Sequence, residues 1–130
     1  MTDAKRLDVL LLDVCAGLNE DSLLPIAISD VLVVILRPDP QDYQGTAVIV
    51  EIARQLKISR NLLVANMVPT AFNFDEVKTK VTQTYHCDEA SVQTYFEEVM
   101  ALASSGIFAL HHPVHPFTGR LQRLAECIDP

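Results

Sequence analysis

The sequence predicts an α/β domain in which a parallel sheet is flanked by helices. Three short apolar runs, at residues 7–13, 31–36 and 62–66, have the length and composition of strands. They lack the apolar and polar alternation of a half-exposed strand, so they are typical of strands buried on both faces of a parallel sheet. Segments with helical spacing alternate with these runs, and the connections are only a few residues long. This order predicts βαβ units.

Size and composition favour one domain spanning residues 1–130. Apolar residues make up 49% of the 130 residues, which is enough for a hydrophobic core. The three cysteines, Cys15, Cys87 and Cys127, are odd in number and widely spaced. This pattern argues against a disulfide framework and for a reducing compartment, so we expect a cytoplasmic protein.

Charge and hydropathy exclude two function classes. The formal net charge is −7 and the ten lysines and arginines are scattered, so we do not expect this chain alone to bind nucleic acid. No apolar segment approaches the length needed to cross a bilayer, and the first residues are polar. We therefore expect neither a signal peptide nor an integral membrane segment.

The first apolar run organises the predicted sheet. Residues 7–13 end at Asp13, and a glycine, Gly17, follows in the next turn. If the run is a buried strand, Asp13 lies at its carboxyl end, which is the edge where open α/β sheets bind ligands. The alternative is that Asp13 only caps the following turn.

The next elements follow from caps and spacing. Asn19 and the acidic residues after it predict a short helix over 19–27. A strand is predicted at 31–36, and two prolines stop it. Apolar positions at helical spacing predict a long helix over 42–57, in which Gly45 either allows close packing on the sheet or is simply tolerated.

The second half repeats this pattern before it becomes less regular. A strand is predicted at 62–66, and Asn73 with Glu76 forms a capping-box pattern at the start of a helix over 73–85. Helical spacing from Val92 to Ala103 predicts one helix over 88–104. The remaining segments are expected as a brief strand or packed loop at 107–110, a rigid loop at 111–116 and a terminal helix at 117–128.

Several of these segments together resemble the MinD/ParA family of deviant Walker-A ATPases. Residues 10–17 are similar to the family's hydrophobic strand with its Asp and Gly, and residues 30–42 to its next strand and Arg-Pro-Asp turn. Residues 62–66 resemble its strand ending in Asn, and residues 100–116 the C-terminal part of cyanobacterial-type members. The resemblance implies a partial P-loop NTPase fold, corresponding to the family's C-terminal half.

The resemblance also implies site residues. Asp13 corresponds to the Walker-B carboxylate that holds a Mg²⁺-coordinating water, Gly17 to the switch II glycine, and Asn66 to the side chain that recognises adenine. A carboxylate at a strand end can bind hydrated Mg²⁺, and an amide can pair with adenine's donor and acceptor together.

The chain contains no Gly-x-x-x-x-Gly-Lys-Ser/Thr phosphate loop, and Val14, Cys15 and Met67 depart from the family motifs. Without the loop's amides and lysine, nothing offsets the charge of a triphosphate, so hydrolysis by this chain alone is not expected. We expect no cofactor for the chain alone, and Mg-ATP only if an N-terminal half supplies the loop. The sequence fits a truncated gene product, a degenerate paralogue or an expressed fragment.

Other candidate constellations favour structural roles. His111, His112 and His115, with His86 and Cys87 elsewhere, suggest zinc, but their spacing and the neighbouring prolines favour a surface loop. A thiol nucleophile at Cys15 is disfavoured because the nearby Asp13 would raise its pKa. The acidic pairs at 75–76 and 97–98 fit solvated helix faces, because adjacent helical residues diverge by about 100°.

Two function classes remain. One is a nucleotide-dependent switch of the MinD/ParA type, represented by a half that needs its phosphate loop from elsewhere. The other is a non-enzymatic interaction or dimerisation module. In the family, the phosphate-loop strand lies between the strands that correspond to 7–13 and 31–36, so its absence leaves an apolar edge. We therefore expect a homo-oligomer, formed by edge pairing or by exchange of elements, or a complex with an N-terminal half.

Overall fold

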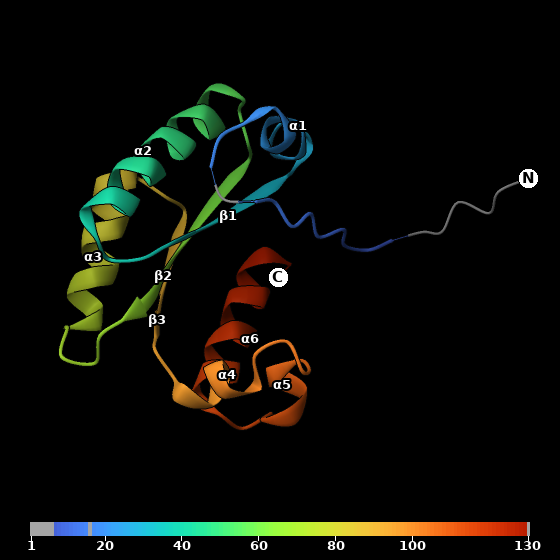
Figure 1. Cartoon of the computed structure of the whole chain (residues 1–130). Helices are drawn as coiled ribbons and strands as arrows, with labels where there is room; N and C mark the ends of the chain where they lie inside the picture. The colour runs from blue at the N-terminus through green and yellow to red at the C-terminus, as the bar shows by residue number, and fades with distance from the viewer. Residues whose placement is uncertain (1–6, 16, 130) are drawn as a thin grey trace, which may run out of the picture.

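The computed structural model describes residues 7–15 and 17–129, and its α/β architecture confirms the predicted fold class (Figure 1). The described residues form a parallel sheet of three strands with helices on both faces. The elements are α1 (Glu20–Ile28), β1 (Val31–Leu36), α2 (Pro40–Gln55), β2 (Arg60–Val68), α3 (Phe74–Tyr85), β3 (Glu89–Thr94), α4 (Glu97–Leu102), α5 (Phe108–His111) and α6 (Pro116–Ile128).

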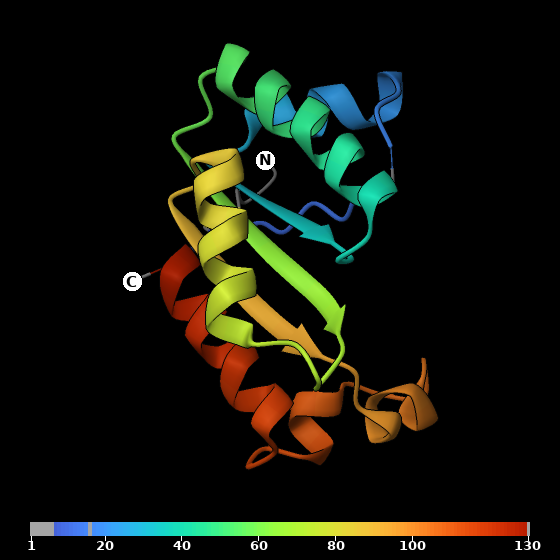
Figure 2. The same cartoon turned by 90° about the vertical axis from the view of Figure 1, so that its left-hand side faces the viewer.

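The strand order is β1-β2-β3, so β2 lies in the centre and is paired on both sides. In the parallel register Val34 lies opposite Leu63, and Leu63 in turn lies opposite Ala90. The helices α2 and α3 lie side by side on one face of the sheet, and α6 packs against β3 on the other face (Figures 1 and 2). This arrangement leaves β1 and β3 as the edges of the described sheet.

The predicted helix starts are confirmed by their side-chain caps. The Asn19 side chain accepts a hydrogen bond from the Ser22 amide at 3.0 Å, and the Ser22 hydroxyl oxygen accepts one from the Asn19 amide at 2.9 Å. The Asn73 side chain accepts from the amides of Asp75 and Glu76. These bonds satisfy amides that have no partner inside the helix, and they fix where α1 and α3 begin.

The core lies between the sheet and the pair α2 and α3. Its side chains come from the three strands and from α2 and α3, and the Tyr85 hydroxyl donates a hydrogen bond to the carbonyl oxygen of Tyr43 at 2.8 Å. Burial raises the pKa of the Tyr85 hydroxyl and that of the Cys87 thiol. The buried core residues are Val34, Leu36, Val50, Leu63, Ala65, Val68, Val81, Tyr85, Cys87 and Ala90.

The predicted strand at residues 7–13 is wrong. These residues form an irregular segment in which Leu11 is 79% exposed, so Asp13 does not end a core strand. An apolar run becomes a strand only where a neighbouring strand can pair with its backbone. Within the described residues, β1 pairs with β2 alone, and residues 7–13 pair with neither.

The predicted helix over 88–104 is also wrong in its first half, because residues 89–94 form β3 and only Glu97–Leu102 is helical. Pairing with β2 buries Ala90 and lets the Thr94 hydroxyl donate a hydrogen bond to the Val68 carbonyl oxygen at 2.8 Å, and this tertiary gain outweighs the helical spacing of the apolar residues. Residues 108–111 form the short helix α5 where a strand or loop was expected, and the terminal helix is confirmed as α6.

Candidate functional site

A groove separates β1 from the irregular segment at residues 7–15. Its volume is about 470 Å³, and residues 10–15 form one wall, while α1 and residues 31–35 of β1 form the others. The segment lies alongside β1 and runs in the same general direction (Figures 1 and 2). It is therefore placed like a further strand of the sheet, but it does not pair with β1.

Two of the three sequence-predicted site residues line this groove. Asp13 is exposed and Gly17 has a φ of +98°, a conformation that favours glycine and turns the chain towards α1. The wall that β1 contributes to this groove is apolar and consists of residues 31–35. Asp13 thus lies in an irregular segment next to β1 and not at the end of a strand of the sheet.

Asn66, the third predicted site residue, lies elsewhere. It belongs to β2, close to the carboxyl end of the strand, and does not line the groove that contains Asp13 and Gly17. The pairing of β2 with β3 shifts register between Ala65 and Val68, and Met67 adopts a φ of +56°. Such an irregularity redirects side chains, so the described structure does not bring Asn66 and Asp13 together in one cavity.

Among the described residues, no helix covers the face of β1 that carries Ile35 at this position. Val34 and Leu36 point towards α2 and are buried, whereas Ile35, on the other face, is 67% exposed. All-parallel sheets normally have both faces covered, so this exposure is unusual. The apolar segment beside it is also exposed, at Leu7, Val9, Leu10, Leu11, Leu12 and Val14.

The loop that follows β1 is fixed by Asp42. The backbone amide of Arg37 donates a hydrogen bond to the Asp42 carboxylate at 2.9 Å, and the Arg37 guanidinium lies 3.4 Å from the same carboxylate. The amide hydrogen bond, together with the guanidinium, lowers the pKa of Asp42 below its ordinary value. Asp42 therefore holds the carboxyl end of β1 against the start of α2.

The histidine-rich segment is structural. His115 accepts a hydrogen bond from the Phe117 amide at 3.1 Å and caps α6, and its ring packs edge-on against Phe96 at 4.7 Å. The His112 ring lies 4.5 Å from the Phe108 ring. Across the described residues, no three histidine, cysteine or acidic side chains cluster as metal ligands.

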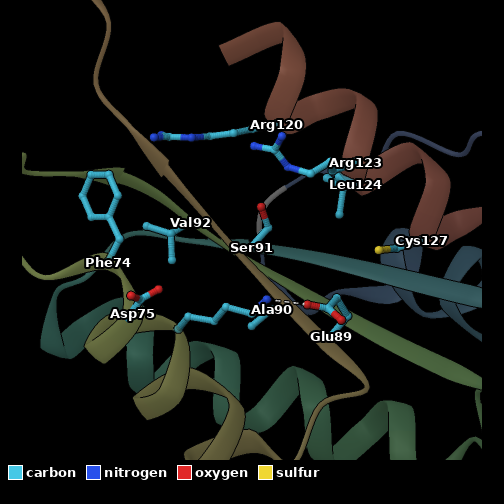
Figure 3. A pocket seen from close by; sticks show the side chains of 11 residues that line it. Phe74, Asp75, Glu89, Ala90, Ser91, Val92, Arg120, Arg123, Leu124 and Cys127 are labelled. Atoms are coloured by element: carbon cyan, nitrogen blue, oxygen red, sulfur yellow. Dashed lines mark ion pairs between the residues drawn. The ribbon is translucent and has the colours of Figure 1, made fainter. Parts of the chain in front are cut away.

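A second cavity, of about 350 Å³, lies at the outer edge of β3 between α3 and α6 (Figure 3). Arg120 and Arg123 extend into it from α6, and Lys78 of α3 forms a 2.7 Å ion pair with Glu89 of β3. Sequence reasoning missed this cavity. The sequence contains two arginines about one helical turn apart, Arg120 and Arg123, which could have indicated this site. The incorrect prediction of a helix over 88–104 left out β3, the strand whose edge these arginines face.

Comparisons of this chain with protein families, curated proteins and solved structures give no match. Within the described residues, no helix is both long and apolar enough to cross a membrane.

Proposed function

We propose that this chain is a protein-interaction module that assembles with a second copy of itself through β1 and the segment at residues 7–15. The observation that carries this proposal is the outer edge of β1, which pairs with no other described residue and lies beside a groove that separates it from the apolar segment at residues 7–15. Unpaired strand edges pair readily with other chains. Burial of the exposed apolar side chains would supply the main driving force.

A second copy is a suitable occupant because each copy carries both halves of the contact. Residues 31–36 contain neither a charge nor a proline, which are the usual means of protecting an edge strand. Residues 9–12 are likewise apolar. Two copies can therefore use the same surface on both sides, either by pairing their β1 edges or by exchanging the segments at 7–15, which is the arrangement of a two-fold dimer.

We expect dimers in light scattering across a dilution series, and we expect Ile35→Lys to weaken the association at least tenfold. Ile35 is exposed, so the monomer tolerates lysine, whereas burying an isolated ammonium in an apolar contact costs several kcal/mol. The matched control is Val114→Lys, at a position that is 97% exposed in the segment between α5 and α6. This variant should associate like the wild type.

A monomer at every concentration would contradict the proposal. So would an Ile35→Lys variant that associates as tightly as the wild type, or a loss of association in Val114→Lys alone. Circular dichroism of each variant separates loss of association from loss of the fold.

A second candidate is the nucleotide-switch half implied by the MinD/ParA resemblance. It is supported by Asp13 at the groove beside β1 and by Asn66 near the carboxyl end of β2, the end of a parallel strand where nucleotides bind. In this proposal an N-terminal half would fill the groove with the phosphate-loop strand. Asp13 would then hold a Mg²⁺-bound water, and Asn66 would contact adenine.

Under either function we expect the chain alone neither to bind Mg-ATP tightly nor to hydrolyse it, because it lacks the amides and lysine that hold the phosphates. Calorimetric titration with Mg-ATP is the measurement, and Asn66→Ala is the control for recognition of the base. Micromolar affinity that Asn66→Ala abolishes would contradict this expectation, because the chain would then contain a nucleotide site of its own.

A further inference from the structure

We propose that the cavity between α3, β3 and α6 binds a small anionic ligand, whose phosphate or carboxylate group is held by Arg120 and Arg123. Both side chains extend from α6 over the outer edge of β3, on the same side as the Ser91 hydroxyl (Figure 3). They lie three residues apart and therefore occupy neighbouring positions on one helix face. Two guanidinium groups and a hydroxyl can together donate to several oxygens of one anion.

Arg120 is already held in position for such a contact. Its guanidinium lies over the ring of Phe74, 5.3 Å from the ring centre. Its Nη1 atom is shielded from solvent and has no hydrogen-bond partner among the described residues. A shielded donor without a partner is unfavourable, and a ligand oxygen that accepts from Nη1 would remove this penalty.

The acidic side chains of the cavity do not neutralise the two arginines. Glu89 is paired with Lys78 at 2.7 Å, and no ion pair within the described residues involves Arg120 or Arg123. The remaining carboxylate, Asp75, projects from α3, across β3 from the arginines (Figure 3). The charged side chains that line the cavity are those of Lys78, Arg120, Arg123, Asp75 and Glu89. The cavity therefore has one positive charge in excess, whereas the net charge of the chain is −7.

The cavity also limits the size and shape of the ligand. A volume of about 350 Å³ is at the small end of ligand-binding pockets. Phe74, Val92 and Leu124 supply apolar walls beside the arginines. The ligand we infer therefore has one anionic group and a small apolar or planar body, and Asp75 disfavours a second anionic group near α3.

Calorimetric titration at low ionic strength with phenyl phosphate and with benzoate, each of which has one anionic group on a planar apolar ring, tests this proposal. We expect at least one of the two to bind, and its affinity to fall as salt is added. Binding of phenyl phosphate alone would identify a phosphate ligand, and binding of benzoate alone a carboxylate ligand. In the double variant Arg120→Gln with Arg123→Gln, the affinity should fall at least tenfold, because charge-assisted hydrogen bonds are lost.

The matched control is Arg54→Gln, which removes an arginine of α2 that is paired with Glu51 at 2.7 Å, outside the cavity. The affinity of Arg54→Gln for the anion should equal that of the wild type. If thermal melting shows that the double variant does not fold, Arg123→Gln alone serves in its place, because this side chain makes no hydrogen bond or ion pair within the described chain. The proposal is overturned if neither anion binds at millimolar concentration, or if the arginine variants bind as tightly as the wild type.

Discussion

Replacing Val34 by aspartate will unfold the domain. Val34 is 6% exposed and packs in the core between the sheet and α2. An unpaired carboxylate there costs several kcal/mol, against a total stability of about 5–15 kcal/mol for a domain of this kind. Far-UV circular dichroism should show loss of the folded spectrum at room temperature, and the cooperative thermal transition should disappear.

The same substitution at Leu11 is the matched control, because both residues belong to apolar runs of similar composition. Leu11 is 79% exposed, so Leu11→Asp should change the free energy of unfolding by only about 0.5 kcal/mol. If Leu11→Asp unfolded the domain as Val34→Asp does, residues 7–13 would be an interior strand after all. The arrangement of the groove beside β1 would then be wrong.

Shortening Leu63 to alanine will lower the stability more than any other single truncation proposed for this chain. Leu63 is fully buried at the centre of β2, where it faces Val34 on one side and Ala90 on the other. Truncation of a buried leucine costs about 2–5 kcal/mol, because the cavity that it leaves is only partly filled by relaxation. The thermal midpoint should fall by more than about 8 °C.

Leu110→Ala provides the control for Leu63→Ala, since it makes the same chemical change at a side chain that is 76% exposed. Urea denaturation of the two variants measures the difference in their free energies of unfolding. An equal loss in both variants, or no loss in Leu63→Ala, would show that β2 is not the centre of the core.

The sequence predicted the elements whose local signals agree with their surroundings. The runs at 31–36 and 62–66 became β1 and β2, and the side chains of Asn19 and Asn73 cap the predicted helices. In each case local preference and tertiary packing favour the same structure. Such agreement between levels is what makes an element predictable from its residues alone.

The failures occurred where a neighbour decides the structure. Residues 7–13 have the composition of a strand and lie alongside β1, but a groove separates the two and they do not pair. Residues 89–94 follow a helical spacing of apolar residues but pair with β2. Of the candidate site residues, Asp13 and Gly17 line the same groove, although Asp13 does not end a strand. Asn66 was expected at the end of its strand and lies next to an irregularity within it. The arginines of α6 were missed because the strand edge they face was not predicted.

The position of β2 also determines how small this domain can be made. The segment from β1 through α2 to β2 and the segment from β2 through α3 to β3 are two crossover units that share one strand. Removing either unit leaves β2 with an open edge and exposes the side chains of Leu62 and Leu63, which are fully buried in the intact sheet. Neither unit is therefore a separable folding module, and the shortest stretch of this chain that keeps a doubly paired strand runs from residue 31 to residue 94.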